Sequence, residues 1–208
     1  MSGLPLIEPS QIALLIVDQQ AGLAFGVGSG DRQLLLSNAV ALAKIASTFK
    51  IPTVISTSAS KVYSGPLMPP IKSVLSEIPV HERRSMNAWE DDATRNAIEK
   101  TGRRKLLVSG LLTEACVSFP VLTALHDGYD VFVVGDTCGG ITPASHDLAL
   151  RRLEAAGAKM TSWLQVLLEL QRDWTRKETY DAARAIVEGH AGGYGIGLAY
   201  ARDMIHPV

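Results

Sequence analysis

Residues 105–117 read Lys-Leu-Leu-Val-Ser-Gly-Leu-Leu-Thr-Glu-Ala-Cys-Val, and this stretch decides the fold class. Its beginning is an aliphatic run that predicts a buried strand over Lys105–Ser109. We expect a helix to follow from about Glu114 to His126, where Gly128 stops it. A buried strand that leads directly into a helix is the repeating unit of a parallel α/β sheet.

The same unit recurs on both sides of this stretch. Aliphatic runs predict further strands at Ile12–Val17, at Thr53–Ser56, from Val80 onward, at Val131–Val134 and at Lys159–Thr161. Helical patterns predict helices at Arg32–Phe49, Ile71–Leu75, Asp91–Thr101, Thr142–Ala155 and Trp163–Leu170. No internal repeat or low-complexity linker separates these units. The sequence therefore predicts one doubly wound α/β domain over residues 1–172 and a peripheral helical tail over 173–208.

The composition excludes several classes of function. The chain has 208 residues with 20 Lys and Arg against 21 Asp and Glu, and it lacks the clustered cationic excess that a nucleic-acid surface needs. Its longest apolar runs, such as Ile12–Val17, are far shorter than the ~20 residues of a membrane helix. The N-terminal residues do not have the pattern of a secretory leader, and two cysteines provide no disulfide framework. We expect a cytoplasmic protein that binds neither nucleic acid nor a membrane.

Candidate functional residues follow three of the predicted strands. Asp18 follows the first strand, Arg83 and Arg84 end the third, and Cys116 follows the fourth. Ligand sites in open parallel sheets lie at such carboxyl ends. A cysteine in the first turn of a helix faces unpaired N–H groups, which favour its thiolate and can hold an oxyanion. Cys116 is thus the candidate nucleophile. Each of these residues also has a purely structural interpretation: Cys116 as a small buried side chain, Asp18 as a turn cap, and the two arginines as a solvated pair.

Three motifs together resemble those of a known family. They are Leu-Leu-Ile-Val-Asp-Gln-Gln at 14–20, Arg-Arg-Ser-Met-Asn-Ala-Trp at 83–89 and Ser-Gly-Leu-Leu-Thr-Glu-Ala-Cys-Val at 109–117. In this order and spacing they resemble the isochorismatase-like cysteine hydrolases, over roughly residues 10 to 170. The segments 132–136 and 163–174 are similar to the YcaC-type branch in particular.

The resemblance implies a six-stranded parallel sheet with helices on both faces and an Asp-Lys-Cys triad. Asp18 and Cys116 match the aspartate and the nucleophile, and the lysine position falls on Arg83, a departure from the family pattern. Arg84 is one residue away and stays an alternative. The resemblance also implies a non-proline cis peptide at Leu112–Thr113, with the backbone N–H groups of Thr113 and Cys116 facing an oxyanion.

The same resemblance implies hydrolysis of a C–N bond in a small amide-like substrate through a thioester on Cys116. True isochorismatases cleave a vinyl ether and need no thiol there. Nicotinamidase-type members carry an Asp and His metal site after the second strand, where this chain reads Ser-Thr-Ser-Ala-Ser-Lys at 56–61. We therefore expect neither a metal nor a cofactor.

Four residues are candidates for lining a substrate pocket: Gln20, Phe25, Trp89 and Leu112. For Trp89 and Phe25, packing in the core is an equal alternative. Two other functions stay open, a nonhydrolytic binding module on the same fold and a thiol redox sensor that pairs Cys116 with Cys138. Apolar residues in the tail and the resemblance to the YcaC-type branch predict a large homo-oligomer, for which the resemblance suggests an octamer.

Overall fold

The computed structural model describes residues 6–205, and a six-stranded parallel sheet lies at its centre. The strand order is β3-β2-β1-β4-β5-β6. The strands are β1 (Ile12–Val17), β2 (Thr53–Ser58), β3 (Val80–Arg83), β4 (Lys105–Gly110), β5 (Asp130–Val134) and β6 (Lys159–Thr161). All five neighbouring pairs run parallel. The predicted fold class is confirmed.

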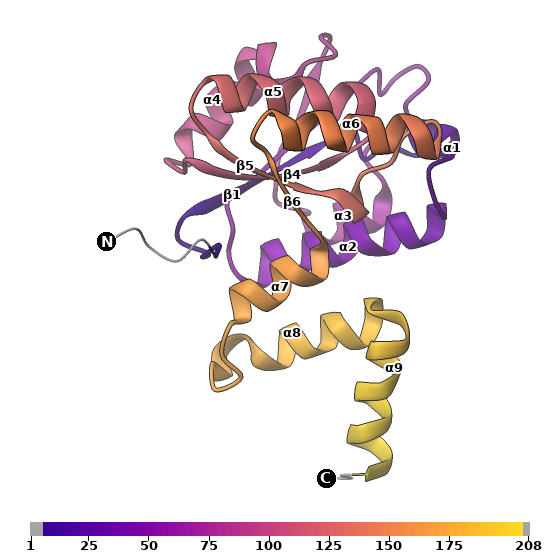
Figure 1. The fold of residues 1–208 in the computed structure, drawn as a ribbon, viewed down its shortest axis with the longest axis vertical. Coiled ribbons are helices and arrows are strands. Elements are labelled where there is room, and N and C mark those ends of the chain that lie inside the picture. The colour runs from indigo at the N-terminus through magenta and orange to yellow at the C-terminus, as the bar shows by residue number, and fades with distance from the viewer. Residues whose placement is uncertain (1–5, 206–208) are drawn as a thin grey trace.

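Two layers of helices cover the sheet (Figure 1). On one face lie α4 (Asp92–Lys100), α5 (Ser118–His126) and α6 (Pro143–Ala155). On the other lie α2 (Arg32–Thr48), α3 (Pro69–Val74) and α7 (Trp163–Gln171). The six-residue helix α1 (Ala21–Gly26) was not predicted, because it is too short to show a helical period.

Strand β1 divides the core into two halves. Successive side chains of a strand point to opposite faces, and every residue of β1 is buried. Ile12, Leu14 and Ile16 belong to the cluster formed with α2 and α7, whereas alternate residues Ala13, Leu15 and Val17 belong to the cluster formed with α4, α5 and α6. Burial on both faces explains why β1 reads as a continuous aliphatic run.

The chain order fixes where the strand ends form a crevice. From β1 the chain proceeds outward through β2 to β3, and then returns to β4 on the other side of β1. The strand order therefore reverses between β1 and β4, which is where open α/β sheets place their ligand sites. Gly110 ends β4 so close to β1 that a Cβ atom would lie 2.1 Å from the Val17 carbonyl oxygen. The two strand ends that precede Asp18 and Cys116 are thus held in direct contact.

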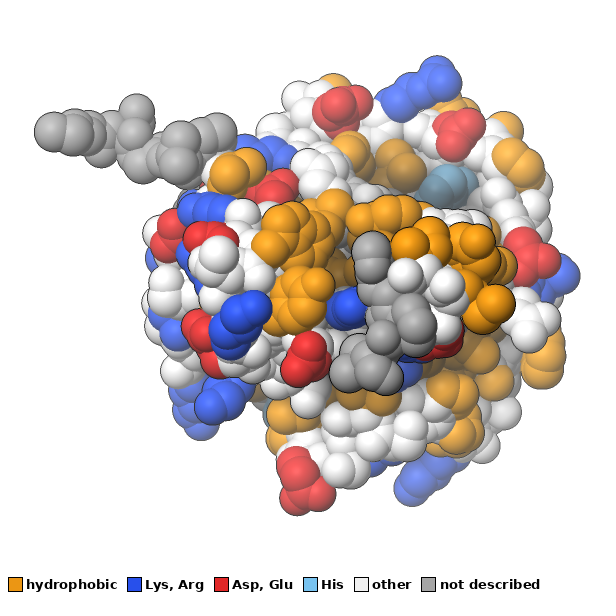
Figure 2. All heavy atoms as spheres, turned by 90° about the horizontal axis from the view of Figure 1, so that it is seen from below, with side chains coloured by type: hydrophobic (Ala, Val, Ile, Leu, Met, Phe, Trp, Pro, Cys, Tyr) orange, Lys and Arg blue, Asp and Glu red, His pale blue; other side chains and the backbone are white. Residues whose placement is uncertain are grey.

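The tail consists of α8 (Lys177–His190) and α9 (Gly192–Tyr200), followed by a short helical turn over Ala201–Ile205. Helix α8 buries Ala183, Ile186 and Val187 in the same cluster as α2 and α7. Helix α9 instead extends away from the α/β body (Figure 1) and exposes Tyr194, Ile196 and Tyr200. Figure 2 views the molecule from this end and shows hydrophobic side chains gathered on that face.

Within residues 6–205, no helix combines the length and apolar character needed to cross a membrane. His206, one of the five histidines of the chain, lies outside the described residues.

Candidate active site

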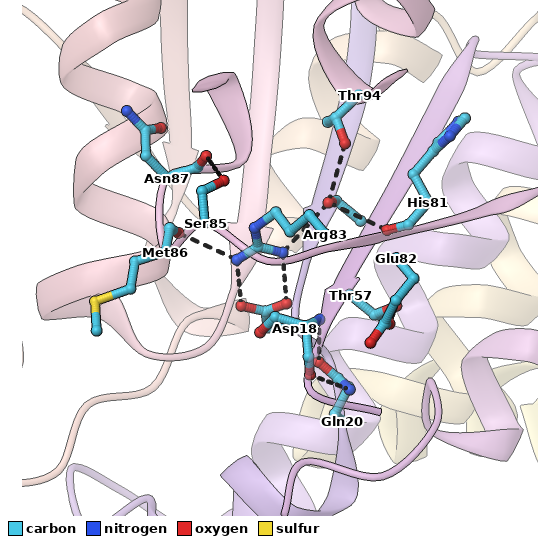
Figure 3. Close-up of polar contacts among 12 residues, drawn as sticks. Asp18, Gln20, Thr57, His81, Glu82, Arg83, Ser85, Met86, Asn87 and Thr94 are labelled. Carbon is cyan, nitrogen blue, oxygen red and sulfur yellow. Dashed lines mark hydrogen bonds and ion pairs between the residues drawn. The ribbon is translucent and has the colours of Figure 1, made fainter. Parts of the chain in front are cut away.

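A buried ion pair joins the ends of β1 and β3 (Figure 3). Arg83 Nη1 and Nη2 donate to the two carboxylate oxygens of Asp18 at 2.7 and 2.6 Å, and both side chains are fully buried. Asp18 has a positive φ of 52° at the end of β1, and its N–H donates to the Ser56 carbonyl at 2.9 Å. The two parallel hydrogen bonds fix the carboxylate plane as well as its position.

Arg83 reaches Asp18 across the end of an intervening strand. β2 lies between β1 and β3, and on the way Nη1 donates to Ser56 Oγ at 3.3 Å while Nη2 donates to the Met86 carbonyl at 3.1 Å. Within the described chain, its buried Nε has no hydrogen-bond partner. Arg84 is exposed. Arg83 therefore occupies the position beside Asp18 that the resemblance assigned to a lysine.

The half-buried side chain of Cys116 completes this group. It lies on a five-residue π-helical turn, Thr113–Val117, that leads into α5. The Asp18 carboxylate and the backbone N–H of Leu112 both lie close enough to its sulfur to affect the pKa of the thiol. Residues that are nearly 100 positions apart in the chain thus meet at the point where the strand order reverses.

Burial raises the pKa of the Cys116 thiol to about 12, and the negative charge of Asp18 and the hydrogen bond to it add to the effect. The guanidinium of Arg83 and the Leu112 N–H lower this pKa, but by less. The expectation that the start of a helix favours the thiolate was therefore wrong for this site. Desolvation and a neighbouring carboxylate outweigh the helix N-terminus, so the resting thiol keeps its proton for Asp18.

The backbone beside Cys116 differs in two details from the prediction. The cis peptide bond joins Leu111 and Leu112, one residue before the predicted position. The Thr113 N–H donates to the Gly139 carbonyl at 2.9 Å and is therefore not free to face an oxyanion. The Leu112 N–H, which lies near the sulfur and lowers the pKa of the thiol, is the better placed donor.

The four predicted pocket residues have different surroundings. Gln20 is buried, and its side-chain amide holds the loop after β2 through Ser58 N at 3.1 Å and Ser58 O at 3.0 Å. Trp89 is 2% exposed and packs edge-on against Tyr129 in the core, so it does not line a pocket. Phe25 is 75% exposed on α1, and Leu112 is half-buried beside Cys116. Among these four residues, Leu112 is the one whose backbone N–H lies near the Cys116 sulfur.

Several polar residues that support the site were not predicted. Gln19 is fully buried, and its Nε2 donates to Ser109 Oγ at 3.1 Å and to the Thr137 carbonyl at 2.8 Å, which ties together the ends of β1, β4 and β5. Ser56 Oγ shares a hydrogen bond with Thr94 Oγ1 at 3.1 Å. Their place next to Asp18 and at the end of a strand was the available signal, but neither carries a chemistry that distinguishes it in a sequence.

A cavity of about 180 Å³ lies between α2 and the end of β5, and its lining does not include Asp18, Arg83 or Cys116. Its polar lining residues include Asn38, Asp136 and His146, and Cys138 forms part of its wall. Burial raises the pKa of Cys138 to about 12. Across residues 6–205, no group of three or more His, Cys, Asp or Glu side chains is arranged to hold a metal ion.

Comparisons with known proteins agree with this geometry. The isochorismatase domain model matches residues 12–165. The chain is 37% identical over 169 residues to the probable hydrolase YcaC of Escherichia coli K12, an alignment that covers 81% of each chain.

Two solved structures share the fold over nearly the whole chain. E. coli YcaC, described as an octameric hydrolase of unknown specificity, matches with a TM-score of 0.92 at 32% identity, covering 99% of this chain and 100% of that one. YcaC from Pseudomonas aeruginosa, with hexane-2,5-diol and covalent acrylamide, matches with a TM-score of 0.90 at 36% identity, covering 96% and 98%. The chain therefore belongs to the isochorismatase family and is an isochorismatase-like hydrolase.

Proposed function

We propose that the protein hydrolyses a C–N bond in a small amide-like substrate, with Cys116 as nucleophile and Asp18 as general base. The observation that carries the proposal is the buried Asp18 carboxylate, which Arg83 holds in two-point contact and which lies close enough to the Cys116 thiol to raise its pKa. A nucleophile, a base within hydrogen-bond reach and a third group that orients the base are the parts that covalent catalysis requires.

Proton transfer to Asp18 is the first step. The pKa of about 12 keeps the Cys116 thiol protonated at neutral pH. Asp18 therefore takes this proton as the sulfur attacks the carbonyl carbon, so that the thiolate never has to accumulate. Arg83 acts as a fixed positive charge that orients Asp18, because a guanidinium stays protonated and does not exchange the proton itself.

In the remaining steps, Asp18 carries each proton that is transferred. The S–C bond forms while the carbonyl oxygen gains a negative charge, which the backbone N–H groups of Leu112 and Cys116 are positioned to stabilise. The C–N bond then breaks, and the amine leaves with the proton held by Asp18. Asp18 next takes a proton from water, whose oxygen attacks the thioester; the carboxylic acid is released and the Cys116 thiol regains its proton.

The relatives support parts of this proposal. The P. aeruginosa YcaC structure contains covalent acrylamide, an amide-bearing electrophile. A thiol in the equivalent fold is the kind of group that would form such an adduct, which favours a reactive centre over a passive binding module.

Intact-mass measurement after incubation with a panel of small amides tests the proposed function. We expect a transient acyl adduct in the wild-type protein and none in a Cys116→Ser variant. Binding of an amide without an adduct or product would instead favour a nonhydrolytic binding module. Reversible loss of both free thiols under mild oxidant, without turnover, would favour a redox sensor.

We also propose that copies of the chain assemble through the tail. Helix α9 exposes Tyr194, Ile196 and Tyr200 to solvent, and the related E. coli YcaC is described as octameric. Light scattering at micromolar concentration should give a mass well above the 22.3 kDa of one chain. A monomer would contradict this assembly without affecting the proposed chemistry.

A further inference from the structure

Glu114 lies two residues before Cys116, and its carboxylate reaches a different part of the chain. Its Oε1 accepts hydrogen bonds from the Ile141 N–H at 2.9 Å and from Ser145 Oγ at 3.1 Å. Ile141 belongs to the loop that follows β5, and Ser145 to the first turn of α6. The side chain thus fastens the turn that carries the nucleophile to the neighbouring loop.

The segment that contains this loop and the start of α6 contacts residues 111–113 at three further points. The Thr113 N–H donates to the Gly139 carbonyl at 2.9 Å, Leu111 and Gly139 form a parallel β-bridge, and Thr113 Oγ1 shares a hydrogen bond with His146 Nδ1 at 2.8 Å. Together with those of Glu114, these contacts hold residues 111–114 against that segment. We call them the loop frame.

The fit within the loop frame is tight around Gly140. A Cβ atom at this position would lie 2.7 Å from Glu114 Oε2 and 3.0 Å from His146 Cβ. On its other side, the Gly140 carbonyl accepts the N–H groups of Gly28 and Ser29 at 3.0 and 3.2 Å. The loop therefore has little freedom to shift if the Glu114 contacts remain, because backbone on one side and the carboxylate on the other confine it.

The loop frame determines which backbone N–H groups are free. It occupies the N–H of Thr113, whereas the N–H of Leu112 donates to no backbone carbonyl among the described residues and lies near the sulfur of Cys116. Glu114 is not among the groups that shift the pKa of Cys116, whereas Asp18 and Arg83 are. Its influence on the nucleophile is thus geometric.

From these contacts we infer that Glu114 is a positioning residue, which holds the backbone of residues 111–114 so that the Leu112 N–H faces the oxyanion. The inference rests on the proposed acyl chemistry. It assigns Glu114 no proton transfer and no contact with the substrate. Its isosteric amide should serve equally well, because a glutamine Oε1 can accept the same two hydrogen bonds.

Two reactions of Cys116 separate this role from a general loss of structure. Acylation by p-nitrophenyl acetate passes through a tetrahedral oxyanion, whereas alkylation by iodoacetamide displaces iodide and forms none. We expect Glu114→Ala to slow acylation by about 10²-fold, the typical effect of a misplaced catalytic group, while alkylation changes less than about threefold. Glu114→Gln should restore acylation, and the pH profile of alkylation should be the same in all three proteins.

The matched control is Ser162→Ala, which removes the N-cap of α7 and weakens the fold without removing any contact of the loop frame. It should leave the ratio of acylation to alkylation unchanged. Equal acylation rates for Glu114→Ala and wild type would overturn the inference, and so would a parallel loss of both reactions in Glu114→Ala. A wild-type protein that acylates no faster than Cys116→Ser would instead overturn the proposed function, which distinguishes the two failures.

Discussion

Cys116 and Cys138 follow neighbouring strands, and burial raises the pKa of both thiols to about 12. Their surroundings nevertheless differ in kind. Cys116 is half-buried and lies near the Asp18 carboxylate, whereas Cys138 is buried and lies near the backbone N–H of Gly110. The comparison teaches that acidity does not distinguish the proposed nucleophile. What separates the two cysteines is the Asp18 carboxylate beside Cys116 and the partial exposure of that side chain.

The largest expected effect comes from removing one sulfur at a time. Cys116→Ser should reduce hydrolysis by at least about 10⁴-fold, as for the nucleophile of other covalent hydrolases. Cys138→Ser should keep hydrolysis within a few-fold of wild type, because its sulfur is buried and Asp18 is not among the groups that affect its pKa. Steady-state rates of both variants on one amide test this difference. Similar rates for the two variants would contradict the assignment of Cys116 as the nucleophile.

Asp18→Asn should make the Cys116 thiol more acidic but less active in hydrolysis. Hydrolysis should fall by about 10³-fold because the base is lost. Since the charge and hydrogen bond of Asp18 raise the Cys116 pKa, the pH profile of alkylation by iodoacetamide should move to lower pH. The Cys138 profile should stay in place, because Asp18 is not among the groups that shift its pKa.

The Asp18→Asn variant leaves the buried Arg83 unpaired, which costs about 3–5 kcal/mol for pairs of this kind. Alkylation should therefore be followed well below the unfolding transition, with circular dichroism as a check of the fold. A Cys116 profile that stays in place would show that burial, and not Asp18, sets the acidity of this thiol.

Arg83→Met should reduce hydrolysis by about 10²-fold, the effect of losing one fixed electrostatic group. Because Arg83 lowers the pKa of Cys116, its loss should also move alkylation of that cysteine to higher pH. Arg83→Lys keeps a positive charge beside Asp18 and should retain much of the activity. The exposed Arg84 supplies the control, and Arg84→Met should hydrolyse as fast as wild type. A loss of activity in Arg84→Met equal to that in Arg83→Met would contradict the assignment of Arg83 as the residue that orients Asp18.

The smallest effect concerns the native cysteines themselves. Iodoacetamide should label Cys116 about tenfold faster than Cys138 in the folded protein, because only Cys116 is partly exposed. Both rates should keep rising between pH 7 and 10 without a plateau, since both thiols have a pKa of about 12. Peptide mapping by mass spectrometry measures both sites, and the two should react alike in concentrated urea. A plateau for Cys116 near pH 7 would mean a thiolate at rest.

The sheet and the three central residues of the site were accessible to sequence reasoning for a common reason. Continuous aliphatic runs such as Ile12–Val17 indicate strands buried on both faces, and strand ends of a parallel sheet meet at one edge. Asp18 and Cys116 could be placed there directly. The position of Arg83 beside Asp18 rested on the resemblance, and the structure selects it over Arg84 because only one of two adjacent side chains in a strand can face inward.

Other features depend on contacts that no local pattern reveals. The acidity of Cys116 was predicted in the wrong direction because its burial and its distance from Asp18 are tertiary properties. Thr113 loses its free N–H to Gly139, and Trp89 packs against Tyr129, in both cases through partners more than 20 positions away. Residues of the loop frame, such as Glu114, gain a role only when the segment after β5 lies against them.

Arg83 spans the width of a strand to reach Asp18, and β3, which carries it, is at the edge of the sheet. Edge strands are held on one side only and open more readily than central strands. Each opening of β3 would withdraw the guanidinium while β1 and β4 stay paired. Under the proposed mechanism, activity depends on the local stability of an outer strand, and low denaturant should abolish activity together with the hydrogen-exchange protection of β3, before the centre of the sheet unfolds.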